Sequence, residues 1–235
     1  MGDRDATIRS AEEWVRFVFD RPVCTEPYEA WLQEQALNGW SAADRPVEAI
    51  AYLTSCCAQA ARLLSPYRDD QLASGFSYVL AFDISDYQSS LLDEQVSLDD
   101  AVQCISSMTA VFAALLDVRL RDASLCDATH TGLALTCVRW WIWLARVDGM
   151  AHVYGSRRRE VLATAAIEAQ SLILRGSRSE FCAASALWGL RQWGMVGSRR
   201  AMAEPVVQKF LTRRDRLGRA LRQLAAECLE GPVSL

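Results

Sequence analysis

Helical periodicity along almost the whole chain is the feature that most constrains the fold. Apolar residues recur at three- and four-residue spacing, and the strict alternation of a β-strand is nearly absent. In the segment 98–116, for example, the apolar side chains fall on one face of a helix. With 12 Gly and 6 Pro in 235 residues, the chain lacks the turn density of an all-β fold. The sequence therefore predicts an all-α fold.

Capping residues and helix breakers divide this pattern into about 9–11 helices. Ser10 and Ser97 each precede a carboxylate three residues later, an arrangement in which the hydroxyl accepts a hydrogen bond from the first helical turn. Asp44 is expected to cap another helix in the same way. The expected helices span residues 10–19, 25–38, 44–64, 69–82, 98–116, 129–147, 157–174, 180–192, 198–211 and 215–230, with a turn and a short helix over 83–92.

An internal repeat favours stacked helix pairs. Residues 183–189 (AASALWG) align with residues 225–231 (AAECLEG), 42 residues later. A period of about 40–47 residues is typical of two-helix HEAT and armadillo units. We therefore expect antiparallel helix pairs stacked as a HEAT-like α-solenoid, with an irregular helical bundle as the alternative.

Acidic and basic residues are distributed unevenly along the chain. Residues 1–149 carry two acidic residues for every Arg, and residues 150–235 carry two basic residues for every acidic one, within a net charge of −4. Such an asymmetry selects partners by charge. Because no linker composition separates the halves, we expect one helical domain over 1–235. The alternative is an acidic subdomain over residues 1–148 and a basic subdomain over residues 149–235, meeting at Asp148-Gly149.

The eight cysteines do not form the pattern of a disulfide framework. Cys56 and Cys57 are adjacent. Four others lie in apolar periodic runs, where cysteine packs as a small core residue: Cys104, Cys137, Cys182 and Cys228. No apolar signal segment follows Met1, and no run approaches 18 consecutive apolar residues. We therefore expect free thiols, a cytoplasmic protein and no membrane association.

Three groups of residues together resemble an uncharacterised family of bacterial all-helical proteins. They are residues 75–80 (GFSYVL) with 83–87 (DISDY) and 91–93 (LLD); residues 138–143 (VRWWIW); and residues 184–190 (ASALWGL) with Trp193-Gly194. The resemblance covers roughly residues 10–230. It implies a bacterial source and a HEAT-like helical fold, but no activity and no functional residues.

No motif typical of a catalytic site is present, since GxSxG, HExxH, GxxxxGK[ST] and GxGxxG are all absent. The one grouping with zinc-binding residue types is Cys126, His130, Cys137 and His152, and it contains no CxxC pair. Asp83 and Asp86 are three residues apart, which suits Mg²⁺ on one helical face, but no DDxxD motif accompanies them. We therefore expect no metal and no cofactor, and keep a metal-dependent helical enzyme as an alternative.

Carboxylates between residues 69 and 100 provide a candidate surface for a protein partner. Its expected residues are Asp83, Asp86, Tyr87, Asp93, Glu94 and, from the Trp-rich segment, Trp141. Asp69, Asp70, Asp99 and Asp100 are instead expected at helix starts, where carboxylates stabilise the first turn. Consecutive helical positions diverge by about 100°, so at least one indole among residues 140–143 is expected to face outward, and Trp is enriched at binding hot spots.

Arginines of the second half form an alternative surface for nucleic acid. Its expected residues are Arg213, Arg214, Arg216, Arg219 and Arg222. Phosphate neutralisation needs such a surface, but the net negative charge of the chain opposes it.

The sequence favours a non-catalytic protein-binding module. Within that class we expect an immunity-type protein that neutralises a basic toxin, because an acidic surface speeds the capture of a basic partner. The alternatives are a nucleic-acid-binding or DNA-repair HEAT-like protein and a metal-dependent enzyme. The oligomeric state stays open.

Overall fold

The computed structural model describes residues 8–20, 42–80, 85–126, 132–145, 156–194, 197–212 and 218–230. Every regular element in these ranges is a helix, so the all-α prediction is confirmed. The elements are α1 (Ala11–Phe19), α3 (Pro46–Ala58), α4 (Ala60–Leu63), α5 (Asp69–Leu80), α7 (Tyr87–Leu92), α8 (Leu98–Val111), η1 (Phe112–Leu116), α9 (Asp117–Arg119), α10 (Gly132–Leu144), α13 (Ser156–Gly176), α14 (Glu180–Gly189), η2 (Leu190–Gly194), η3 (Gly197–Arg199), α15 (Arg200–Leu211) and α16 (Arg219–Glu230).

Serine side chains cap several of these helices. Ser10 Oγ accepts a hydrogen bond from the Glu13 amide at 3.1 Å, and Ser97 Oγ caps α8 in the same way, as predicted. The prediction for Asp44 is wrong, because Arg45 precedes α3 and forms no side-chain cap. Pro46 begins that helix, at a position where its missing N–H costs no helical hydrogen bond.

The predicted boundaries differ from the structure mainly where a helix changes its winding. The predicted helix 44–64 divides at Gln59 into α3 and α4. The predicted helix 98–116 continues to Arg119 through the π-helical turn η1. The predicted helix 25–38 and the boundary at Asp148-Gly149 lie outside the described residues.

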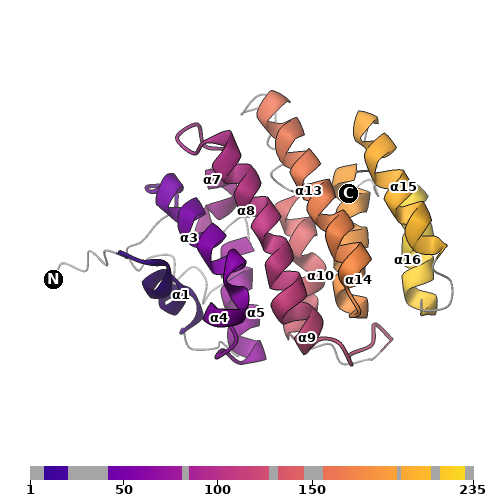
Figure 1. The fold of residues 1–235 in the computed structure, drawn as a ribbon, viewed down its shortest axis with the longest axis horizontal. Coiled ribbons are helices and arrows are strands. Elements are labelled where there is room, and N and C mark those ends of the chain that lie inside the picture. Colours follow the sequence, from indigo (N-terminus) through magenta and orange to yellow (C-terminus); the bar gives the residue numbers. More distant parts are fainter. Residues whose placement is uncertain are drawn as a thin grey trace.

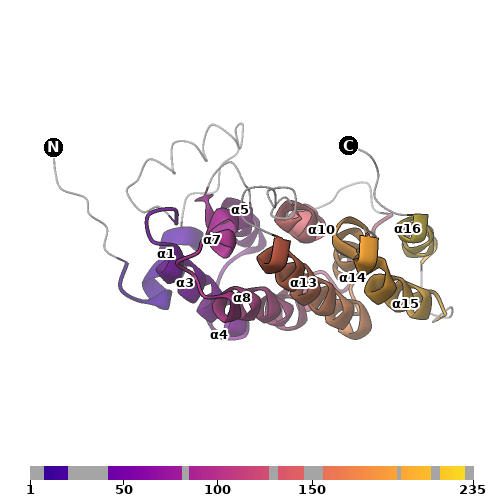
Figure 2. The ribbon, with the colours of Figure 1, turned by 90° about the horizontal axis from the view of Figure 1, so that it is seen from above.

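The helices form two rows (Figures 1 and 2). In the front row α3 packs on α8, α8 on α13, and α13 on α15. In the back row α1 packs on α5, α5 on α10, α10 on α14, and α14 on α16. Both rows therefore continue without interruption from the acidic half of the sequence into the basic half.

From α3 and α5 onward, neighbouring helices within a row run in the same direction. The first helix, α1, runs opposite to α5, because Gln71 near the start of α5 donates to the Phe19 carbonyl at the end of α1. At the start of α13, Arg158 contacts the backbone just before α8, and after α13 the Ser179 amide contacts Asp117 at the start of α9. In the back row, the Ser185 hydroxyl donates to the Cys137 carbonyl. The contacts at both ends of α13 show that α13 and the run Leu98–Arg119 are in register.

Aromatic rings join the two rows at the centre of the molecule. Phe112 from the front row lies 5.4 Å from Trp140 and 6.1 Å from Trp141, measured between ring centroids. Cysteines fill smaller spaces in the same core. The predicted core positions Cys104, Cys137, Cys182 and Cys228 are all buried, and every described cysteine is a free thiol.

One helical run among the residues that the structure describes, Leu98–Arg119, is long and apolar enough to cross a membrane by length and composition. It lies in the middle of the front row, between α3 and α13. Half of its most apolar 18-residue window is buried inside the protein. A helix buried in a protein core has the same apolar composition, so this run does not by itself indicate a membrane span.

Candidate functional site

The acidic residues predicted to bind a partner lie at the two ends of α7. Asp86 precedes this helix and Asp93 follows it. Asp86 and Glu94 are exposed, whereas Asp93 is half-buried and its Oδ1 accepts a hydrogen bond from the Gln95 amide at 2.8 Å. Asp83 lies outside the described residues.

Tyr87 and Trp141 are buried, so the prediction that they belong to an exposed surface is wrong. The Tyr87 hydroxyl accepts a hydrogen bond from the Trp14 indole. Trp141 stacks on Phe112. Because α10 packs against both α5 and α14, its consecutive indoles are covered on different sides. The partly exposed indole of this segment is Trp143.

The acidic cluster of the sequence is divided between the two ends of the helical run Leu98–Arg119. Asp69 pairs with Arg119 at 2.9 Å, and the Arg68 guanidinium, 3.0 Å from Asp70, lowers the pKa of that carboxyl. The run Leu98–Arg119 separates these pairs from the start of α8 by about 30 Å at 1.5 Å per residue. The remaining exposed carboxylates form the acidic end of the molecule: Asp86, Glu94, Asp99 and Asp100.

Asp69 and Asp70 form ion pairs, whereas the carboxylates of the acidic end form none within the described residues. None of its four carboxylates forms an ion pair with another described residue. Arg158 lies close to this end: burial lowers the pKa of its guanidinium, and the charges of Asp93 and Glu94 raise it. A residue of the basic half therefore offsets some of the negative potential at this end.

The basic surface is only partly within the described residues. Arg219 and Arg222 are exposed on α16, whereas Arg213, Arg214 and Arg216 lie outside the described ranges. Other arginines of this half form ion pairs with carboxylates of the same half. These are Arg191 with Glu227 at 3.7 Å, Arg199 with Glu160 at 3.8 Å, and Arg200 with Glu204 at 2.9 Å. At least three of the 14 basic residues of this half are thus paired with carboxylates.

The residues described in the structure contain no group of three or more His, Cys, Asp or Glu side chains placed to hold a metal ion. His130 and His152 from the zinc grouping lie outside the described ranges. Asp86, from the Mg²⁺ hypothesis, has left-handed backbone geometry with φ of 56°.

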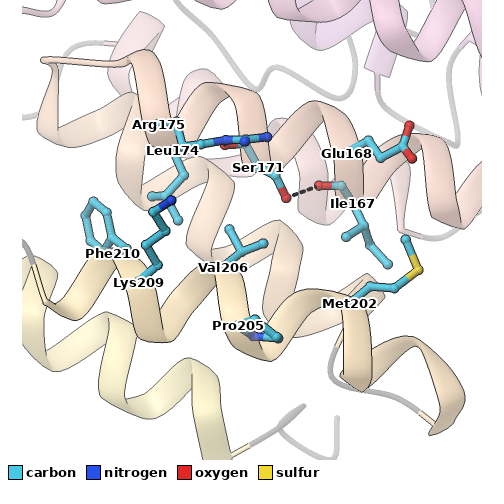
Figure 3. A pocket seen from close by; sticks show the side chains of 10 residues that line it. All are labelled: Ile167, Glu168, Ser171, Leu174, Arg175, Met202, Pro205, Val206, Lys209 and Phe210. Carbon is cyan, nitrogen blue, oxygen red and sulfur yellow. Dashed lines mark hydrogen bonds between the residues drawn. The ribbon is translucent and has the colours of Figure 1, made fainter.

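A groove that the sequence did not predict lies between α13 and α15 (Figure 3). Its volume is about 330 Å³. It is lined by Ile167, Glu168, Ser171, Leu174, Arg175, Met202, Pro205, Val206, Lys209 and Phe210. These residues follow the ordinary spacing of two helical faces. The unusual residue among them is Pro205, because proline is rare inside a helix.

Charged side chains lie at the two ends of this α13–α15 groove. Figure 3 shows Glu168 beside Met202 at one end, and Arg175 near Lys209 at the other. Arg175 Nε donates a hydrogen bond to the Ser171 carbonyl at 3.1 Å, which holds the guanidinium along the groove. The middle of the groove is apolar, so it combines an apolar floor with a charge difference along its length.

Two further hollows lie on the other side of α13, against α8. One is lined by Val102 and Val161 among others, and the second contains Leu172, which is 55% exposed. The neighbouring segment 101–116 carries no charged residue. Hollows therefore lie along both sides of α13, and the segment of α8 and η1 beside it is uncharged.

Comparison of the chain with protein-family models, with curated proteins and with solved structures finds no match in any of the three. The family resemblance noted from the sequence receives no support from them. The function is accordingly proposed from the residues and their geometry.

Proposed function

We propose that this chain is a non-catalytic protein-binding module built as a HEAT-like stack of helix pairs. The support for the stack is the two-row packing, in which α8 and α13 are parallel and in register. The repeated segments at 183–189 and 225–230 lie on α14 and α16, which are adjacent in the back row. Stacks of this kind present extended surfaces that suit macromolecular partners.

The observation that carries the proposal is the open apolar surface beside α13. Met202 is 40% exposed in the α13–α15 groove, and Leu172 is exposed in the hollow on the opposite side. In the same chain Trp14, Trp140 and Trp193 are completely buried. Apolar surface left exposed at a groove is typical of an interaction site.

The narrower proposal is a cytoplasmic immunity-type protein that neutralises a basic toxin. It is supported by the exposed carboxylates of the acidic end, which have no described ion pair. Uncompensated negative charge of this kind accelerates the approach of a basic partner and makes the association rate depend on salt.

A double charge reversal, Glu94→Lys with Asp99→Lys, tests the acidic end. These positions are chosen because Asp93 and Asp100 accept local hydrogen bonds, and Asp86 has backbone geometry that Lys adopts poorly. The matched control is Asp122→Lys with Glu230→Lys, which changes the net charge equally at exposed positions elsewhere.

The measurement is capture of host proteins by the tagged chain, followed by kinetics with the captured partner. We expect the association rate to fall about tenfold or more in the acidic-end variant and to change little in the control. Rescue of growth from the toxic partner should weaken in parallel. Equal association rates for the two variants would refute the acidic end as the site.

The nucleic-acid alternative depends on the basic surface predicted from the sequence, of which the described residues Arg219 and Arg222 are exposed on α16. It predicts DNA or RNA retention that falls steeply with salt and is lost when both arginines are replaced by Ala. The metal-dependent alternative depends on Asp83 and Asp86 and predicts detectable Mg²⁺ or Mn²⁺ binding.

A further inference from the structure

We propose that the α13–α15 groove is the docking site for an amphipathic helix of the partner, with carboxylates at the end of that helix beside Arg175 and Lys209. The inference rests on the proposed function, because it takes the partner to be a protein. It adds the site, the secondary structure of the bound segment and the placement of its charges.

The dimensions of the groove suit about two turns of helix. Its wall on α13 extends from Ile167 to Leu174, and its wall on α15 from Met202 to Phe210. At 1.5 Å per residue these walls are about 10–12 Å long. An amphipathic helix places three or four apolar side chains on one face over that length, at positions i, i+3 or i+4, and i+7.

The groove is open along its length. Met202, Pro205 and Lys209 on the α15 wall are exposed, as are Glu168 and Arg175 on the α13 wall. Sites for small molecules bury about 70–90% of their ligand. An open apolar groove instead covers one face of an elongated ligand and leaves the other face in solvent, as a docked helix requires.

The charges determine which helix fits and in which orientation. Arg175 and Lys209 place two positive charges at one end, and Glu168 places a negative charge at the other (Figure 3). Carboxylates at the Arg175 end gain two favourable interactions, whereas the reversed helix would bring them to Glu168. Charge pairs at the rim of an interface fix orientation and exclude wrong partners.

Pro205 is a second feature that points to the same surface. It lies inside α15, where its missing N–H leaves the Ala201 carbonyl without the usual helical donor. Its side chain is exposed on the groove wall, so burial in the core of this chain does not offset that loss. The rigid ring instead contributes to the apolar surface on which the helix would lie.

The test uses two synthetic helix-stabilised peptides with the same apolar stripe. One carries two Glu at one end, and its twin carries two Lys there. Binding is measured by fluorescence anisotropy, and the site is located from amide chemical shifts. The protein variants are Met202→Asp in the groove, Lys209→Glu at its positive end, and Val47→Asp as the matched control, since Val47 is 48% exposed on α3.

We expect the Glu peptide to bind and to shift amides of α13 and α15. Met202→Asp should weaken it about tenfold or more, and Val47→Asp by less than about twofold. Lys209→Glu should shift the preference toward the Lys peptide. Equal binding of both peptides to the wild type, or shifts outside these helices, would overturn the proposal.

Two further arms separate this inference from the proposed function. Capture of one stoichiometric host protein equally by wild type and Met202→Asp would overturn the groove and leave protein binding standing. If no host protein is captured but the Glu peptide still binds in the groove, the proposed protein-binding function is overturned and the groove stands as a helix-binding site. If neither peptide binds and decanoate binds in the groove, the proposed helical ligand is wrong and the ligand is a small apolar carboxylate.

Discussion

Arg158 donates hydrogen bonds to the Leu91 carbonyl oxygen from two guanidinium nitrogens, Nε at 3.0 Å and Nη2 at 2.9 Å. Its third nitrogen, Nη1, donates to the Val96 carbonyl at 2.9 Å. The two acceptors flank the loop between α7 and α8. One arginine of the basic half therefore fixes the backbone of the acidic end.

Arg158→Ala should destabilise the fold, because both carbonyl groups lose a charged donor. We expect the free energy of unfolding to fall by about 2 kcal/mol, measured by urea denaturation followed by circular dichroism. Arg157→Ala is the control, since Arg157 is the exposed neighbour and its loss should change stability by less than about 0.5 kcal/mol. Equal effects of the two substitutions would show that the bonds from Arg158 contribute nothing.

Gly75→Ala should also be destabilising, because of a steric conflict in the core. A Cβ atom at this position would clash with the ring of Phe19 at Cδ1. That ring cannot move freely, since it is buried against Phe76 and Tyr67. We expect the free energy of unfolding to fall by about 1–3 kcal/mol.

The control for this change is Gly176→Ala at the end of α13, where a Cβ atom meets nothing within 4 Å. It should be neutral or stabilise by up to about 1 kcal/mol, because Ala restricts the unfolded chain. Thermal denaturation of both variants measures the difference. A Gly75→Ala protein as stable as the wild type would mean that the helices α1 and α5 separate easily.

The buried thiols make stability dependent on pH in the alkaline range. Burial raises the pKa of Cys56, Cys104 and Cys228 from 9.0 to about 12. Between these values the unfolded thiols ionise while the native ones stay protonated. The native state then binds more protons, so the free energy of unfolding falls as pH rises above about 9, by up to about 1.4 kcal/mol per unit for each thiol.

Urea midpoints measured from pH 7 to pH 10.5 check this behaviour. They should be level below about pH 8 and decrease above pH 9, and Cys104→Ala should show a shallower decrease. Cys126→Ala removes an exposed thiol and should retain the wild-type slope. Identical slopes for wild type and Cys104→Ala would contradict the protonated state of the buried thiol.

Local signals in the sequence predicted much of the fold. Ser10 and Ser97 cap their helices because capping depends on residues within one turn of each other. Cys104 and Cys228 are buried because their helical faces are apolar and each helix must bury that face. Properties set by neighbours within one helix were therefore predictable.

Properties set by contacts between helices could not be predicted from the sequence. Trp141 was predicted to be exposed because one helix cannot direct three indoles to the same side. It is buried because α10 packs against both α5 and α14, which cover two sides of the helix. Asp69 and Asp99 belong to one acidic cluster in the sequence, but Asp69 pairs with Arg119 at the end of the run Leu98–Arg119, whereas Asp99 lies at its start. The α13–α15 groove likewise depends on the distance between two helices, and the spacing of apolar residues within one helix does not predict that distance.

The measurement that tests the central claim most directly is capture from an extract of the native host, with and without nuclease, at low and physiological salt. The proposed function predicts one stoichiometric protein partner, bound by wild type and by Val47→Asp and resistant to nuclease. Nucleic acid recovered without any protein partner would contradict it and would assign the function to the arginines of α16.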